Sequence, residues 1–249
     1  MKLLKLSLSS LALLSIFSNI NAQEKEIELD PITVTASLTP VSASQTGRNI
    51  LIIKGDALQK LPVQSIDELL RYVPGVEVQS RGPMGAQADF TIRGGTFQQV
   101  LVILDGIRLN DPLTGHFSSY IPISPAEIDR IEVLKGASSA IYGTEAVGGV
   151  VHIISKTFAA KKNTNGHKIN AQLTAGDYGL FNVQAGAFLH QKNTTASVGV
   201  MTNNTNGQQL RGTKGYFNLT TISASIKQAL SENTSVAYRF GYDDRDFNA

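Results

Sequence analysis

The stretch 158–249 alternates apolar and polar side chains with a period of two, and no helical periodicity interrupts it. Because strand residues point alternately to the two faces of a sheet, this pattern predicts strands with one apolar and one polar face. Phe188 is an exception, since it falls among the polar positions of its strand. The expected antiparallel strands lie near residues 167–175, 180–189, 194–202, 217–228 and 234–242.

Two architectures share this alternation, a soluble β-sandwich and a transmembrane β-barrel, and periodicity alone does not separate them. Connection lengths favour the barrel, because barrels have short turns at one end and longer loops at the other. The connections near 190–193 and 229–233 are short and 203–216 is long, although 176–179 departs from the rule. About five strands fall short of the roughly 8 that the smallest barrels need, so we expect an N-terminal fragment of a longer protein.

Residues 1–22 have the pattern of a secretory signal peptide. Lys2 and Lys5 precede an apolar run over 6–20, and Ala22 offers a small residue for cleavage. A membrane anchor is the alternative, but the run is shorter than the ~20 residues of a spanning helix. The chain has 22 basic and 20 acidic residues, and the two lysines of this segment account for the difference. A neutral mature chain does not favour nucleic-acid binding.

The region 45–157 mixes short helices, strands and glycine-rich turns. A Ser-x-x-Glu capping box at 65–68 precedes apolar residues at helical spacing, and a second box at 124–127 has proline at its first helical position. The helix after the first box should bury Ile66, Leu69, Leu70 and Val73. Further strands are expected at 131–135 and 150–155, within one small α+β domain.

A tight hairpin is predicted over 100–109, where two apolar runs flank Asp105-Gly106. Asp-Gly favours a two-residue turn that needs positive φ. Asp105 could instead be a phosphatase-type nucleophile, but the second carboxylate of such a site is missing from the neighbouring sequence. Cysteine is absent, which excludes disulfides and cysteine-ligated metals. His116, His152, His167 and His190 lack metal-ligand spacing, and His152 is expected in the core.

The tail 23–44 contains "LDPITVTAS" at 29–37. Pro31 disfavours helix, while the β-branched Thr33, Val34 and Thr35 favour an extended backbone. Such a segment can add to an exposed sheet edge through main-chain hydrogen bonds. An ordinary flexible linker is the alternative.

Together these segments resemble the N-terminal part of a TonB-dependent outer-membrane receptor. "LDPITVTAS" is similar to the TonB box of that family. Three further segments are similar to the plug domain of the family: "VPGVEVQSRGPMGAQADFTIRGG", "VLVILDGIRLNDP" and "IDRIEVLKGASSAIYGTEAVGGVVHIISK". Within the family the cobalamin receptors are most similar, although iron–siderophore and haem receptors share much of these motifs.

The resemblance implies an α+β plug domain followed by antiparallel β-strands of an incomplete transmembrane β-barrel. The implied boundaries are a signal peptide at 1–22, a tail at 23–44 with the TonB box at 30–37, the plug at 45–157 and barrel strands at 158–249. In the family the plug closes a barrel of about 22 strands. The implied function is TonB-dependent import of a scarce large ligand, cobalamin or an iron–siderophore or haem, without catalysis. The implied partners are TonB, this ligand and outer-membrane lipid.

Residue roles follow from the same resemblance. Arg93 would contact carboxylates of the barrel wall, because a buried guanidinium needs such partners. The TonB-binding residues would be Asp30, Pro31, Ile32, Thr33, Val34, Thr35 and Ala36. The substrate-binding residues, on loops 81–89 and 110–120, would be Met84, Gln87, His116, Phe117 and Tyr120. No cofactor or metal is expected, with calcium at Asp243, Asp244 and Asp246 as a secondary possibility.

Two rival interpretations remain at this point. A passive plugged porin or adhesin-like barrel would share the fold without coupling to TonB. A secreted enzyme with a β-rich domain would need a catalytic constellation, and no Ser/His/Asp or paired-carboxylate arrangement stands out.

Overall fold

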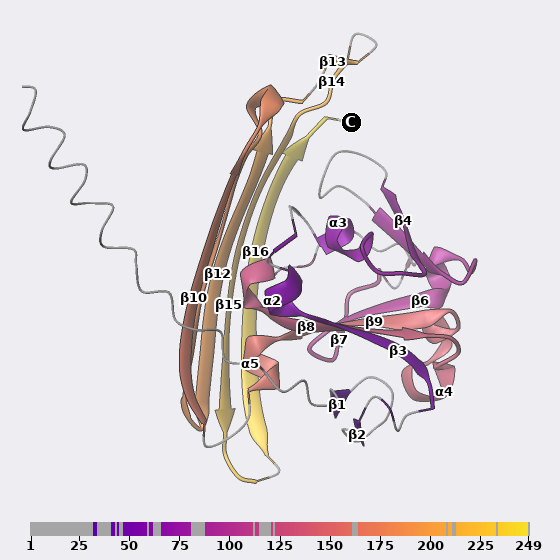
Figure 1. The fold of residues 1–249 in the computed structure, drawn as a ribbon, viewed down its shortest axis with the longest axis vertical. Coiled ribbons are helices and arrows are strands. Elements are labelled where there is room, and N and C mark those ends of the chain that lie inside the picture. The colour runs from indigo at the N-terminus through magenta and orange to yellow at the C-terminus, as the bar shows by residue number, and fades with distance from the viewer. Residues whose placement is uncertain are drawn as a thin grey trace, which may run out of the picture. The chain divides into compact units, whose positions relative to one another are not determined.

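The computed structural model describes two five-stranded sheets, three two-stranded ones and short helices (Figure 1). The predicted signal peptide at 1–22 lies outside the described residues, as does most of the predicted tail. The structure describes residues 32–33, 41–42, 44, 47–58, 60–61, 66–80, 88–111, 113–114, 121, 123–160, 164–207, 209–210, 213–232 and 234–248.

The predicted plug domain, residues 45–157, which we call the plug, contains a mixed five-stranded sheet in the order β3-β8-β9-β6-β7. Only β6 and β9 pair in parallel, and all other neighbours are antiparallel. Strands β6 and β9 are nearly continuous apolar runs because both of their faces are covered. The five strands are β3 (Asn49–Lys54), β6 (Val100–Leu104), β7 (Ile107–Arg108), β8 (Ile128–Lys135) and β9 (Gly149–Ser155).

Short helices and a hairpin cover this sheet. Helix α3 (Ile66–Leu70) buries the predicted apolar residues of its face together with Val73, which confirms the helical spacing. Its N-terminal serine lies outside the described residues. The other covering elements are α2 (Gly55–Leu58), β4 (Val76–Ser80), β5 (Ala88–Ile92), η3 (Phe97–Gln99), η4 (Pro125–Glu127), α4 (Ser139–Tyr142), η5 (Thr144–Ala146) and α5 (Lys156–Ala159).

The predicted hairpin is confirmed. Strands β6 and β7 pair with Leu104 opposite Ile107, and Asp105 and Gly106 form the turn with φ of 50° and 93°. Positive φ at both turn positions is what this two-residue turn requires. The Asp105 carboxylate also accepts hydrogen bonds from the Ser155 backbone N–H at 2.8 Å and hydroxyl at 2.7 Å. Asp105 is therefore held between the hairpin and the end of β9.

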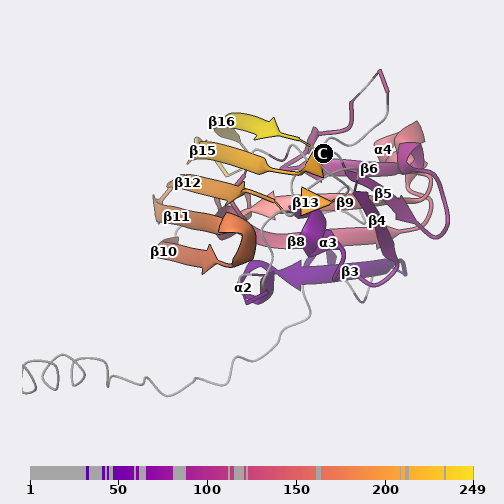
Figure 2. The ribbon, with the colours of Figure 1, turned by 90° about the horizontal axis from the view of Figure 1, so that it is seen from above.

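The second sheet contains five antiparallel strands in sequence order, and Figure 2 shows them side by side. Each strand is longer than the alternation predicted, because Asn, Gln, Thr and Asp continue the strands where the apolar pattern fades. Only Asn193 separates the second and third strands. The strands are β10 (Thr164–Ala175), β11 (Phe181–Lys192), β12 (Thr194–Thr205), β15 (Phe217–Ala229) and β16 (Ser235–Phe247).

Long and short connections separate to opposite ends of this sheet. The connection 206–216 carries the small strands β13 (Gln209–Leu210) and β14 (Thr213–Lys214), and the tight connection 176–180 contains η6 (Asp177–Gly179). At the other end 230–234 is short. The predicted pattern of lengths is confirmed, including its exception.

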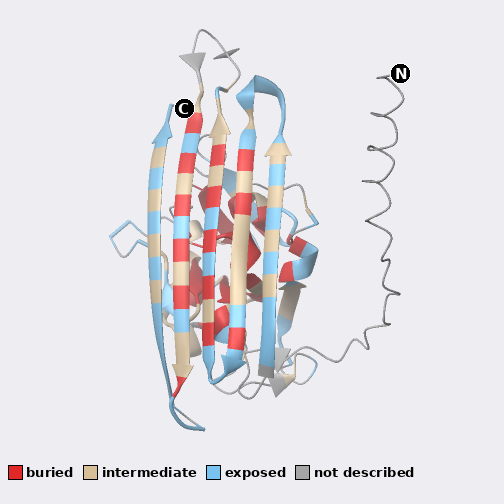
Figure 3. Ribbon diagram, turned by 90° about the vertical axis from the view of Figure 1, so that its left-hand side faces the viewer, coloured by how far each residue is buried: buried red, intermediate tan, exposed pale blue. Residues whose placement is uncertain are grey.

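The second sheet buries a mainly polar face, which also holds Met201, Phe217 and Leu219, and exposes its apolar face (Figure 3). This is the reverse of a soluble sheet, whose apolar face packs on the core. Phe188 is half-buried on the inward face, where it lines a cavity of about 550 Å³ beside α2 and β8. Buried polar residues include Asn182, Gln184, Ser197, Asn203, Thr221, Ser223 and Ser225. Exposed apolar residues include Ile169, Leu173, Leu189, Val198, Ile222, Ile226, Tyr238, Phe240 and Tyr242.

Among the described residues, no helix has both the length and the apolar character needed to cross a membrane.

Candidate functional site

Two residues of the N-terminal box are described. Ile32 and Thr33 form β1 (Ile32–Thr33), which pairs antiparallel with β2 (Val41–Ser42). Their backbone is thus extended and engaged in strand pairing, as the β-branched composition predicts. Asp30, Pro31, Val34, Thr35 and Ala36 lie outside the described residues. TonB binding by the box stays a prediction.

All five residues predicted to bind substrate, namely Met84, Gln87, His116, Phe117 and Tyr120, lie outside the described residues. The structure does describe the start of the second loop. The Asn110 side chain accepts from the Val102 backbone N–H at 2.8 Å and donates to the Val100 carbonyl at 3.0 Å. Asp111 then accepts from the Leu113 backbone N–H at 2.7 Å. These contacts fix the root of the loop on β6.

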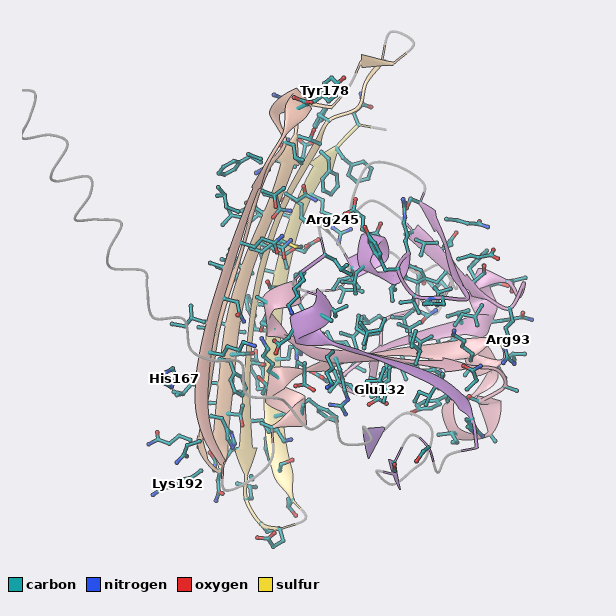
Figure 4. All side chains as sticks on the ribbon, in the orientation of Figure 1. Arg93, Glu132, His167, Tyr178, Lys192 and Arg245 are labelled. Atoms are coloured by element: carbon teal, nitrogen blue, oxygen red, sulfur yellow. The ribbon has the colours of Figure 1, made fainter. Side chains whose placement is uncertain are left out.

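Arg93 is exposed and has a φ of 56°. Figure 4 places it on the side of the plug away from β10–β16, beside Gly136. With the described residues Arg93 forms no ion pair. Its contact with a barrel wall therefore stays a prediction, and the described contacts between the plug and the strands come from other residues.

The first of these contacts is the turn 124–127. Ser124 and Glu127 form the predicted capping box: the Ser124 hydroxyl accepts from the Ala126 backbone N–H at 3.3 Å, and the Ser124 backbone N–H donates to Glu127 Oε2 at 3.2 Å. Glu127 is only 1% exposed. Its carboxylate points onto the second sheet, where it accepts hydrogen bonds from the hydroxyls of Ser197, at 2.9 Å, and Ser223.

Further hydroxyl groups extend this contact. The Thr157 hydroxyl, at the start of α5, donates to Ser197 at 3.0 Å, and the Ser225 hydroxyl donates to Thr157 at 2.8 Å. Ser197 and Ser225 are 2.8 Å apart on neighbouring strands. We call Glu127, Thr157, Ser197, Ser223 and Ser225 the seat network. All five side chains are buried, and they join η4 and α5 of the plug to β12 and β15.

A second contact is an ion pair between Asp105 of the plug and Arg239 of β16. The two side chains are 10% and 14% exposed, so the pair is largely removed from water. The same carboxylate accepts from Ser155, which orients it toward the strand. Largely buried charges require such partners. Asp105 therefore combines the predicted turn with a contact that the sequence did not predict.

Lysines make the peripheral contacts. Lys168 of β10 forms an ion pair with the exposed Asp56, and this hydrogen bond lowers the pKa of the Asp56 carboxyl. Within the plug, Lys156 of α5 donates to the Ala126 carbonyl of η4 at 2.6 Å, and burial lowers the pKa of its ammonium group. Lys227 donates to the Phe158 carbonyl at 2.9 Å and lies 5.3 Å from the centre of the Phe158 ring.

The secondary calcium candidates do not converge. Asp243 faces inward and accepts from Thr221 and Arg245, whereas Asp244 is the next residue on the strand and points to the opposite face. Asp246 accepts from the Tyr216 hydroxyl at 2.9 Å. Among the described residues no group of three His, Cys, Asp or Glu side chains could hold a metal ion.

Local sequence patterns predicted the helix cap within the seat network but not the pairings of the network. Glu127 was interpretable as a helix cap, and the serines occupied the polar positions of the alternating strands. Ser197 and Ser223 follow Glu127 by 70 and 96 residues, so no local pattern connects them.

Comparison with known proteins places this geometry in a family. Residues 42–150 match the family model described as the TonB-dependent receptor plug domain. This segment is similar to a TonB-dependent receptor plug domain. It includes Ser42 of β2, the plug sheet up to the first residues of β9, and the turn 124–127.

Curated relatives include two Vibrio proteins that carry the name vitamin B12 transporter BtuB. The protein from Vibrio cholerae is 32% identical over 188 residues, which are 75% of this chain and 30% of the relative. The protein from Vibrio vulnificus is 34% identical over 160 residues, 64% of this chain and 25% of the relative. The chain thus spans less than a third of the length of these relatives.

Solved structures show the same fold at low identity. The pyoverdine outer-membrane receptor FpvA from Pseudomonas aeruginosa has a TM-score of 0.68 and 19% identity, covering 90% of this chain and 31% of FpvA. The siderophore receptor PiuA from Acinetobacter baumannii has a TM-score of 0.64 and 22% identity, covering 90% and 30%. The copper transporter OprC has a TM-score of 0.64 and 19% identity, covering 80% and 31%.

Proposed function

We propose that this chain supplies the plug and the first barrel strands of an outer-membrane importer that TonB energises. The plug domain and the receptor-like fold support the class. The proposal includes no catalytic role, since the relatives compared above are named as transporters and receptors. A signal peptide at 1–22 would direct the chain out of the cytoplasm.

One observation carries the proposal: the second sheet turns its polar face to the plug and its apolar face outward. In water this would expose a broad apolar surface, whereas in a bilayer the same surface is favourable. Tyr238 and Tyr242 on this face have the ring chemistry that suits a membrane interface. A secreted enzyme with a β-sandwich would show the opposite burial.

For the ligand we propose cobalamin first. The support is the identity to the proteins named vitamin B12 transporter. An iron–siderophore or haem is the second candidate, because the structural neighbours include receptors named for pyoverdine and siderophores.

Growth of a deletion strain tests the ligand. The strain would be complemented with the native gene, including any coding sequence that follows residue 249. We expect failure to grow when cobalamin is limiting and normal growth when iron is limiting, with rescue by the gene. Growth defects under limiting iron alone would replace cobalamin by an iron chelate. Normal growth in both media would overturn both ligands.

Coupling to TonB is tested in the same strain with Val34→Pro. Proline removes a backbone donor, so the box can no longer pair fully with a partner strand. We expect uptake to fall at least about tenfold. Lys25→Pro, upstream of the box, is the control and should leave uptake unchanged. Unchanged uptake in the Val34→Pro variant would favour the passive plugged barrel.

A further inference from the structure

We propose that the turn 124–127 is the docking element of the plug and that Glu127 is the positioning residue that seats it on β11, β12 and β15. The inference rests on the proposed function only in that the plug must sit inside a barrel. It concerns contacts between described residues that lie outside the box and the predicted ligand loops, so it can be tested without TonB and without ligand.

The strands leave space for this turn at two glycines. Gly186 of β11 and Gly199 of β12 are directly opposite one another in the sheet. A Cβ atom on Gly186 would lie 2.8 Å from the Ala126 Cβ, and one on Gly199 would lie 2.8 Å from the Glu127 Cδ and from the Ser124 Cβ. Both contacts are shorter than real Cβ atoms show. Only glycine at these positions admits the turn.

The hydrogen bonds then select an acidic side chain. Three donors point at the two carboxylate oxygens of Glu127: Ser197 at Oε1, and Ser223 and the Ser124 backbone N–H at Oε2. Each serine hydroxyl has a single proton to donate. The chain from Ser225 through Thr157 to Ser197 therefore runs in one direction and ends on the carboxylate. An ionised carboxylate accepts hydrogen bonds at both of its oxygens and donates none.

The location of the network makes it a docking element rather than an isolated contact. Glu127 immediately precedes β8, and Thr157 follows β9 by two residues. These two strands form the centre of the plug sheet. Fixing their ends on β12 and β15 therefore sets the position of the plug core against the barrel strands.

Residues 1–249 contain no cysteine, which makes a direct measurement possible. Gln184→Cys, on the inward face of β11 beside Ala126, would report how often the plug leaves the seat network. The receptor would be labelled with a maleimide in native membranes, and heat-modifiable migration on gels would confirm a folded barrel. With Glu127→Ala we expect labelling to be at least about tenfold faster. This corresponds to a decrease of about 1.4 kcal/mol in the free energy of separating the plug from the strands.

Glycine variants give the matched comparison. Gly199→Ala keeps Glu127, but the added methyl group fills the space that the Glu127 carboxylate occupies. Labelling should therefore accelerate as it does with Glu127→Ala. Gly166→Ala is the control, because a Cβ at Gly166 of the same sheet meets nothing within 4 Å, and its labelling rate should match the parent.

Combined variants separate a hydrogen-bonded seat from general loosening. Ser197→Ala with Ser223→Ala leaves a buried carboxylate without its hydroxyl donors, which is costlier than removing both sides. Adding Glu127→Ala to this pair should therefore slow labelling again. Labelling within about twofold of the parent in Glu127→Ala would overturn the proposal. Equal acceleration in Gly199→Ala and Gly166→Ala would also overturn it. Uptake that does not depend on TonB would refute the proposed function, whereas the expected labelling rates would stay the same.

Discussion

At the scale of single residues, the plug meets the strands through a few polar groups with defined donors and acceptors. Asp105 illustrates the principle, because one carboxylate serves the hairpin turn, the Ser155 contacts and the ion pair with Arg239. A largely buried ion pair is a poor source of net stability, yet breaking it by removing one partner is costly. Asp105 is thus constrained at once by the turn, by Ser155 and by Arg239.

Asp105→Asn provides the residue-scale test. The amide retains the shape and tolerates positive φ, but it leaves the Arg239 guanidinium without a counter-charge. We expect a loss of about 3 kcal/mol in unfolding free energy, measured by denaturant titration of the complete receptor. Adding Arg239→Gln should recover part of this loss.

Glu145→Gln is the matched control for Asp105→Asn. It breaks the exposed pair of Arg108 with Glu145, whose side chains are 54% and 31% exposed. Exposed pairs contribute at most about 1 kcal/mol. A loss with Asp105→Asn no larger than with Glu145→Gln would contradict the importance of the Asp105–Arg239 pair.

At the scale of elements, the central pair β8 and β9 links the plug core to the seat network. Every residue of β9 is buried, including His152, which lies opposite Glu132 of β8. Burial lowers the pKa of the His152 imidazole, while the carboxylates of Glu132 and Asp105 act in the opposite direction and Arg130 adds to the lowering. The neutral form is therefore the one that the folded plug favours.

The stability of the plug should depend on pH through His152. Its folded pKa lies below the ordinary value of about 6.5, so the unfolded chain binds the proton more readily. The contribution of His152 to the unfolding free energy is complete above a pH of about 6.5 and is lost as the pH falls below that value. We expect the melting temperature of the plug to fall on acidification, and His152→Asn to reduce that fall.

The control for this prediction is His167→Asn, which changes an exposed histidine on β10. Its melting temperature should follow the pH dependence of the parent. An identical response of the parent and His152→Asn would show that other groups set the pH dependence.

At the scale of the whole molecule, the two sheets obey opposite rules of burial. The plug sheet has an apolar core, whereas the second sheet buries Asn, Gln, Ser and Thr and exposes Val, Ile, Leu and Tyr. One chain thus contains a segment suited to water and a segment suited to lipid. The proposed membrane insertion follows from this difference.

Charge placed on the outward face tests the proposed insertion. Val198 lies on the middle of β12 and is half exposed, so Val198→Arg would place a guanidinium in the hydrocarbon. We expect a loss of about 2–4 kcal/mol, measured by unfolding from lipid vesicles. Asn218→Arg, near the end of β15, should cost at most about 1 kcal/mol. Equal losses in the two variants would argue against a bilayer around the sheet.

Sequence reasoning succeeded where the controlling interaction was local. The alternation predicted the strands, Asp105-Gly106 predicted the hairpin, and helical spacing predicted the buried face of α3. The seat network escaped prediction because its partners are distant in sequence and hydroxyl residues are common at polar strand positions. Phe188 was an unexplained exception until the cavity beside α2 showed what it lines. Arg93 is exposed among the described residues, so its predicted contact with carboxylates of a barrel wall stays a prediction.

The hydroxyl-rich character of the seat network has a thermal consequence. Exposing polar surface lowers the heat capacity, while exposing apolar surface raises it. Lifting the turn 124–127 from its strands uncovers mainly hydroxyl and carboxylate groups, whereas melting the plug core uncovers Ile, Leu and Val. The free energy of separating the two bodies should therefore curve less with temperature than the free energy of unfolding either one. Under the proposed function, cooling would weaken the seat network less than it weakens the apolar core of the plug.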